Sequence, residues 1–144
     1  MEGSPLDNKV RIGVIGCGDI AFRRYLPGFA EIPDQAEITA VFDLDRDRLQ
    51  HAAAEFGGRA CTTLDELLSM EEIDAVLNLT PPRAHGPVTL TALQAGKHVM
   101  VEKPLAGTVE EADTLIAEAT ARLWRVRQAR QARPATGSAH PVRG

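Results

Sequence analysis

The stretch IGVIGCGDIAFRRYL, from Ile12 to Leu26, decides the fold of this chain. Its start belongs to an apolar run over 10–15 that is rich in β-branched residues, which predicts a buried strand. Two glycines end that run. The apolar residues that follow share one face of a helix: Phe22, Tyr25, Leu26 and Phe29. A strand, a glycine turn and a helix in this order predict a turn that binds phosphate.

Strands and helices alternate through the first 120 residues. Short apolar runs predict strands over 10–15, 37–43, 59–62, 73–79 and 98–101. Apolar residues at helical spacing predict helices over 22–29, 49–56 and 84–95. Capping-box pairs open two more helices, Thr63 with Glu66 and Thr108 with Glu111. This alternation predicts an α/β fold with a doubly wound parallel sheet, whose ligands bind beyond the carboxyl ends of the strands.

The glycine turn matches the dinucleotide fingerprint G-x-G-x-x-A. The first glycine allows a tight turn, the second lets a pyrophosphate approach the backbone, and the small third residue lets the helix pack closely on the strand. The N–H groups at the start of the helix favour the negative charge of the pyrophosphate. The candidate cofactor-binding residues of the turn are Gly16, Cys17, Gly18, Asp19, Ile20 and Ala21.

Asp43 ends the second predicted strand, about 20 residues after the turn, where a carboxylate binds the adenosine ribose. The alternative is a helix N-cap or a solvated loop acid, because Asp45 and Asp47 follow. A carboxylate at this place repels a 2′-phosphate, so it favours NAD over NADP as the cofactor. Arg46 and Arg48 are close enough in sequence to weaken that preference.

The composition is that of a soluble globular domain. Of the 144 residues, 44% are hydrophobic and 25% charged, and neither a signal peptide nor a membrane-spanning stretch is expected. Cys17 and Cys61 are isolated, which favours a reducing, cytoplasmic location. Cys17 stands at a helix N-terminus, where a thiol pKa can be lowered, yet its side chain is expected to be incidental. The four histidines lack ligand spacing, so no metal site is predicted.

Charge divides the chain near residue 120. Residues 1–120 carry 10 basic and 20 acidic side chains, whereas 121–144 carry six arginines and no acid. We therefore expect a flexible N-terminus over 1–8, a dinucleotide-binding domain over 9–120, and a basic, disordered or out-of-frame tail over 121–144. The one regular element compatible with this tail is a continuation of the preceding helix through Trp124 to Gln131. Arginine side chains bind phosphates, so a nucleic-acid-binding tail is the alternative. Trp124 is the only aromatic of the tail available to stack on bases, so nucleic acid is not favoured as a partner.

The stretch NLTPPRAHGPVTLTALQAGKHVMVEKPLA, residues 78–106, resembles the glucose–fructose oxidoreductase/inositol dehydrogenase (Gfo/Idh/MocA) family in its N-terminal, Rossmann-like NAD(P)-binding domain. The resemblance implies that Lys103 is catalytic: it lies beside the nicotinamide and positions or polarises the substrate hydroxyl or carbonyl. It also implies a peptide bond before Pro104 that is often cis. The further cofactor-binding residues that it implies are Thr80, Pro81, His85, Glu102 and Lys103.

Some of these residues have other interpretations. His85 could serve only to cap a helix, and Lys103 could be a surface lysine at a strand end. Pro82 departs from the asparagine that is common after Thr-Pro in the family. Asn78 is expected to be a core amide with satisfied hydrogen bonds rather than a ligand.

The resemblance implies hydride transfer between a nicotinamide and a sugar or polyol-like alcohol. Family members continue into a sixth strand and a C-terminal substrate domain, both of which we expect to be missing here. The chain is then truncated and inactive alone, and its open sheet edge invites self-association into a homo-oligomer. A sugar or polyol-like substrate would bind only if a substrate domain is supplied. The alternative is a non-catalytic dinucleotide-binding module.

Overall fold

The computed structural model describes residues 9–122 and 126–129. They form an all-parallel six-stranded sheet in the order β3-β2-β1-β4-β5-β6. Its strands are β1 (Val10–Ile15), β2 (Ala36–Phe42), β3 (Arg59–Ala60), β4 (Ala75–Asn78), β5 (His98–Glu102) and β6 (Val126–Ala129). The helical segments are η2 (Ala21–Tyr25), η3 (Leu26–Glu31), α1 (Arg46–Phe56), α2 (Leu64–Leu68), α3 (Pro82–Gln94) and α4 (Val109–Ala121). The predicted doubly wound α/β fold is confirmed.

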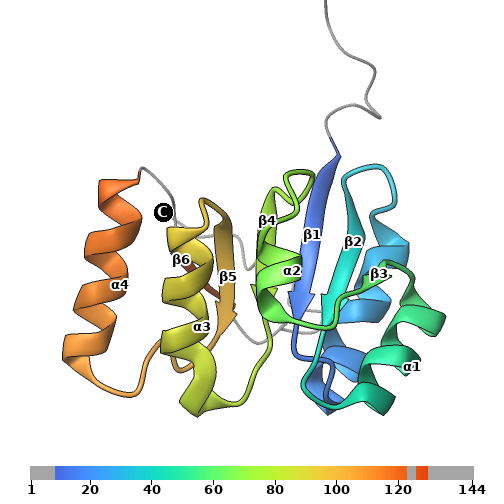
Figure 1. Cartoon of the computed structure of the whole chain (residues 1–144), viewed down its shortest axis with the longest axis horizontal. Helices are drawn as coiled ribbons and strands as arrows, with labels where there is room; N and C mark the ends of the chain where they lie inside the picture. Colours follow the sequence, from blue (N-terminus) through green and yellow to red (C-terminus); the bar gives the residue numbers. More distant parts are fainter. Residues whose placement is uncertain (1–8, 123–125, 130–144) are drawn as a thin grey trace, which may run out of the picture.

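Helices bury both faces of the sheet at β1, as its apolar residues predict, whereas Met100 of β5 is 41% exposed. Val14 and Ile15 point to opposite faces of β1, and each is at most 1% exposed. Ile15 belongs to a core cluster that includes Leu93 of α3 and Leu115 of α4. Val14 belongs to a second cluster, with residues of η2, η3 and α1. Figure 1 shows α3 and α4 side by side, with the arrows of β1, β2 and β5 pointing to one edge of the sheet.

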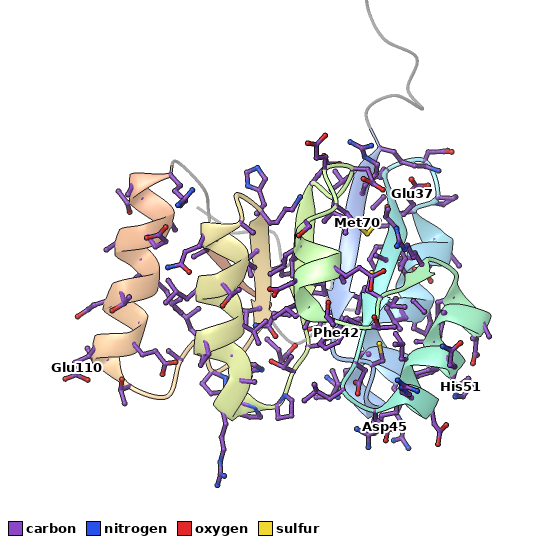
Figure 2. The ribbon with its side chains drawn as sticks, viewed as in Figure 1. Glu37, Phe42, Asp45, His51, Met70 and Glu110 are labelled. Atoms are coloured by element: carbon purple, nitrogen blue, oxygen red, sulfur yellow. The ribbon has the colours of Figure 1, made fainter. Side chains whose placement is uncertain are left out.

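That edge holds the carboxyl ends of the strands. Figure 2 places Phe42 and Asp45 toward it, while Glu37 lies at the opposite end of β2. The strand order reverses between β1 and β4, because the chain adds β2 and β3 on one side and β4 to β6 on the other. Ligands bind in the crevice at such a switch point.

The segment after the glycine turn is helical but irregular. A π turn in η2 passes into the 3₁₀ turns of η3, where we expected one regular helix. Pro27 explains the change, because it has no N–H to continue the α-helical ladder and its ring crowds the preceding turn. The predicted apolar face survives: Leu26 is 1% exposed, and Phe22 and Phe29 pack against the same cluster.

The end of the sheet differs from our expectation. The strand β6 pairs in parallel with β5, from Val126 opposite Val99 to Ala129 opposite Glu102. The expected absence of a sixth strand, and a helix through these residues, are therefore wrong. Strand pairing uses backbone groups, so an arginine-rich segment can provide it without an apolar pattern. The predicted open edge of β5 is covered by β6, which becomes the edge strand of the described sheet.

The expected flexible N-terminus over 1–8 lies outside the described residues, and so does most of the expected basic tail over 121–144, namely 123–125 and 130–144. Within the described part, no helix has the length and apolar character needed to cross a membrane.

Candidate cofactor site

The glycine turn fits tightly against the end of β4. Gly16 has a φ of +98°, and its N–H donates to the Phe42 carbonyl at 2.9 Å. A Cβ at Gly16 would lie 2.6 Å from the Leu79 carbonyl oxygen and 2.8 Å from the Thr80 nitrogen. Because both are backbone atoms that cannot move aside, only glycine fits. A Cβ at Gly18, by contrast, would have only Arg48 Nη1 nearby, at 3.9 Å, so the backbone there is open to a ligand.

Cys17 lies beneath this turn. Its side chain is 1% exposed, and its thiol donates to the Phe42 carbonyl at 3.6 Å. Burial, and then the Asp43 carboxylate, raise the pKa of Cys17 from 9.0 to about 12. The position at a helix start therefore does not lower the pKa of the thiol, because the side chain points into the core. Ala21, the third residue of the fingerprint, is also 1% exposed and packs in the same cluster.

Asp43 joins the end of β2 to the glycine turn. Its Oδ2 accepts from the Cys17 N–H, and its Oδ1 accepts from the Asp45 N–H, each at 2.7 Å. The N-cap of α1 is Asp45, whose Oδ1 accepts from the N–H groups of Asp47 and Arg48. The capping role considered for Asp43 thus falls to its neighbour. Each carboxylate oxygen of Asp43 keeps a lone pair for a further donor.

Asn78 organises the loop between β4 and α3. It is fully buried; its Nδ2 donates to the His85 carbonyl at 3.2 Å and to Thr89 Oγ1 at 3.0 Å. Its Oδ1 accepts from the Thr80 hydroxyl at 2.6 Å and from the Thr80 N–H at 3.2 Å. Asn78 is the satisfied core amide that we expected, and it fixes Thr80 at the edge of the site. Pro82 occupies the first helical position, where its missing N–H costs nothing.

His85 lies in the first turn of α3 and is 1% exposed. Its Nδ1 is 2.6 Å from the Pro104 carbonyl oxygen, and its Nε2 is 2.7 Å from the Thr80 carbonyl oxygen. The capping role is not observed, because α3 has no side-chain cap and the N-cap residue is Pro81. His85 instead bridges the loops that follow β4 and β5.

The end of β5 carries Glu102, Lys103 and a cis peptide bond before Pro104, as the family resemblance implies. Tyr25 of η2 donates its hydroxyl to Glu102 Oε2. Burial, and then this carboxylate, raise the pKa of Tyr25 above its ordinary value, so the hydroxyl remains protonated. Lys103 is exposed and, within the part of the chain that the structure describes, makes no hydrogen bond or ion pair. Its ammonium group is available to a ligand.

These loops enclose one pocket of about 250 Å³ at the carboxyl edge of the sheet. It gathers ten of the twelve predicted site residues; Cys17 and Ala21 lie beneath it. The pocket is lined by Gly16, Gly18, Asp19, Ile20, Asp43, Arg48, Leu79, Thr80, Pro81, Pro82, His85, Glu102 and Lys103.

Three lining residues were not among the predicted site residues: Arg48, Leu79 and Pro82. Arg48 had a signal in the sequence, since it lies in the first turn of the helix after Asp43. Leu79 had none, because its contact with Gly16 appears only when β1 and β4 lie side by side. Tyr25 reaches Glu102 across 77 residues and likewise could not be inferred from spacing.

A larger hollow of about 1040 Å³ lies at the amino ends of β1, β2, β4 and β5. It contains none of the predicted site residues, and ligands of such sheets bind at the opposite edge, so the smaller pocket is the candidate site. No group of three metal-ligating side chains occurs among the described residues.

The switch point, the glycine turn and the acid at the end of β2 define a dinucleotide-binding domain of the Rossmann type. Residues 10–128 match the Gfo/Idh/MocA model, described as an oxidoreductase family with an NAD-binding Rossmann fold. The chain belongs to this family, and it corresponds to the N-terminal domain. The matched range extends through most of β6, which agrees with the pairing of that strand.

The similar proteins include enzymes named for a sugar nucleotide and an enzyme named for inositol. A dTDP-3,4-didehydro-2,6-dideoxy-alpha-D-glucose 3-reductase of Streptomyces violaceoruber is 48% identical over 105 residues, 73% of this chain and 30% of that protein. The 3-ketoreductase KijD10 of Actinomadura kijaniata, solved with NADP and TDP-benzene, is 39% identical with a TM-score of 0.78 (83% of this chain, 36% of that chain). WlbA dehydrogenase of Bordetella pertussis, solved with NADH and UDP-GlcNAcA, is 30% identical with a TM-score of 0.80 (85% and 35%).

This chain therefore spans about a third of the length of its relatives. The two solved structures differ in cofactor, since one holds NADP and the other NADH. The family establishes a nicotinamide dinucleotide as the cofactor class.

Proposed function

We propose that this chain is the cofactor-binding part of an oxidoreductase that transfers a hydride between NAD and a sugar carbon. The observation that carries the proposal is the single pocket that joins the open turn at Gly18, the carboxylate of Asp43 and the ammonium of Lys103. The pyrophosphate would lie over Gly18, and the adenosine ribose would bind Asp43. The nicotinamide supplies the hydride acceptor or donor.

Lys103 supports the catalytic part of the proposal. Its ammonium makes no hydrogen bond or ion pair with the described residues, so it can donate to the oxygen of a substrate hydroxyl or carbonyl. Such a donor stabilises negative charge that develops on this oxygen. Since one relative is named for a dTDP-sugar and another was solved with UDP-GlcNAcA, we infer that the alcohol or ketone belongs to a nucleotide-linked sugar.

Preference for NAD over NADP rests on Asp43. Its carboxylate lies in the pocket and would repel a 2′-phosphate, whereas a ribose hydroxyl can donate to it. Arg48 lines the same end of the pocket and is the group that would favour NADP instead.

Calorimetric titration with NAD and NADP tests this assignment. We expect the unmodified chain to bind NAD more tightly. Asp43→Ala should weaken NAD binding by about 1.5–3 kcal/mol, the contribution of a hydrogen bond to a charged group, and should reduce discrimination against NADP. Asp45→Ala is the matched control, because it removes the adjacent carboxylate that only caps α1. Tighter binding of NADP by the unmodified chain would contradict the assignment.

A further inference from the structure

The side chain of His85 joins two walls of the cofactor pocket. The Thr80 carbonyl belongs to the loop after β4, and the Pro104 carbonyl belongs to the loop after β5, one residue beyond Lys103. The two ring nitrogens lie within 2.7 Å of these oxygens, and the ring is almost completely buried. Among the described residues, no other side-chain hydrogen bond links these two loops directly.

Both partners of the ring are carbonyl oxygens, which only accept hydrogen bonds. A neutral imidazole has one N–H, so its second nitrogen would direct a lone pair at the lone pairs of a carbonyl. An imidazolium ion has two N–H groups and satisfies both oxygens. Hydrogen bonds from a charged donor are also shorter than neutral ones, in agreement with distances of 2.6 and 2.7 Å.

The charged groups around the ring are compatible with a positive charge. Arg83 on α3 and Lys103 after β5 are exposed, so solvent screens their repulsion. Glu102 at the end of β5 is half-buried and lines the same pocket. This carboxylate is screened less than the two cations.

Glu111 brings a second carboxylate from α4. It occupies the space that a side chain at Gly86, the residue after His85, would need. Its Oε2 also accepts from the Gly107 N–H at 3.1 Å, so it holds the far end of the loop that begins at Lys103. The absence of a side chain at Gly86 lets this half-buried anion approach α3 beside the histidine.

We propose that His85 is a doubly protonated positioning residue that ties the loop carrying Lys103 to the loop carrying Thr80. The part of this inference that concerns NAD rests on the proposed function; the charge of the ring does not. Loss of the second proton at higher pH leaves one of the two carbonyls without a donor. The Lys103 loop then loosens and the affinity for the cofactor falls.

The charge of the ring is measured directly by long-range ¹H–¹⁵N NMR of the 144-residue chain at about pH 7, near the ordinary range of histidine. We expect His85 to show two protonated ring nitrogens. His51→Gln, His98→Gln and His140→Gln identify the other three histidines, so the assignment does not require a His85 variant to fold. A neutral-tautomer pattern for His85 at this pH would overturn the proposal.

The positioning role is measured by calorimetric titration of NAD across the pH range in which the NMR signals of His85 change. In the unmodified chain we expect affinity to fall about three- to tenfold, the effect of one lost hydrogen bond, with the same midpoint as the NMR titration. His85→Gln should bind more weakly at low pH and lose this dependence.

His51→Gln is the matched control, since His51 lies on the outer side of α1 and pairs with Glu55 (Figure 2). This variant should keep the pH dependence of the unmodified chain. A His85→Gln variant that folds, binds NAD and retains that dependence would refute the positioning role. If NAD does not bind at any pH, the proposed function fails, whereas the NMR result still decides the charge of His85.

Discussion

At the scale of single residues, the backbone alone explains why one position of the turn, Gly16, must be glycine. Gly16 was predicted to allow a tight turn. The structure adds that a side chain there would strike the backbone of β4, so the residue is required even without a ligand. Gly18 has no such neighbour, and its lack of a side chain leaves room for a ligand. The two glycines of one fingerprint thus have different physical reasons.

The buried thiols provide a prediction at this scale. Burial raises the pKa of Cys61 as it does that of Cys17, and both side chains are at most 1% exposed. We expect neither to react with a thiol reagent at about pH 8 in the folded chain, and both to react in urea. Because the folded state holds the Cys17 proton more tightly than the unfolded state, stability is unaffected below pH 9.0 and falls as pH rises toward about 12. Rapid reaction of one thiol before unfolding would show that Cys17 or Cys61 is accessible.

At the scale of helices and strands, local signals predicted most of the fold. Apolar runs and helix caps predicted five strands and four of the helical segments. Buried strands and buried helix faces consist of apolar residues, so their pattern is visible in the sequence. Each capping box forms with one partner displaced by a residue. The Thr63 and Thr108 hydroxyl oxygens accept from the N–H groups of Glu66 and Glu111, as expected. The glutamate carboxylates, however, accept from the N–H group of the residue before each cap. The strand β6 could not be predicted, since its pairing with β5 depends on backbone groups brought together by the fold.

The cap of α4 predicts a measurable change in stability. Thr108 Oγ1 accepts from the Glu111 N–H at 3.1 Å. Thr108→Ala removes this acceptor and should lower the free energy of unfolding by about 1 kcal/mol. Urea denaturation measures the change, and Thr114→Ala is the control, because the Thr114 hydroxyl lies inside the same helix and donates to Glu110. Equal effects of the two substitutions would show that the cap contributes nothing particular.

The pairing of β6 predicts resistance to proteolysis. Arg127 lies opposite Met100 in the ladder, so its peptide bonds are held in the sheet. Trypsin should cleave after Arg127 far more slowly in the folded chain than in a peptide of residues 120–132, as mass spectrometry of timed digests will show. Similar rates in the two would mean that the strand opens as easily as an unfolded segment.

At the scale of the whole molecule, the cofactor site is assembled from segments that are far apart in the chain. Tyr25 contacts Glu102, His85 contacts Pro104, and Cys17 contacts Asp43. The sequence and the family resemblance identified most of the pocket-lining residues, because the carboxyl ends of parallel strands meet at one edge. The contacts that hold those residues in place were not predicted, since they depend on the order β2-β1-β4-β5 in the sheet.

The exposed position of the cofactor site leads to a prediction about catalytic turnover. Among the described residues, Lys103 is the group that we propose to act on a substrate oxygen, and this side chain is exposed to solvent. Hydride transfer also needs the substrate carbon held against the nicotinamide and away from water. Holding reactants in such geometry contributes about 7–11 kcal/mol to lowering the barrier. We therefore expect this 144-residue chain to bind NAD without appreciable dehydrogenase activity.

The assay is NADH formation at high protein concentration with NAD and a panel of sugars, polyols and nucleotide-linked sugars. Lys103→Ala, which leaves the glycine turn and Asp43 intact, distinguishes activity of this chain from that of a contaminating enzyme. We expect both proteins to bind NAD and to form NADH only at the background rate. Lys103 cannot polarise a substrate oxygen unless the substrate is held against the nicotinamide. NADH formation by the unmodified chain that is lost in Lys103→Ala would show that these residues hold a substrate by themselves. The exposed pocket would then be sufficient for near-attack geometry, contrary to the argument above.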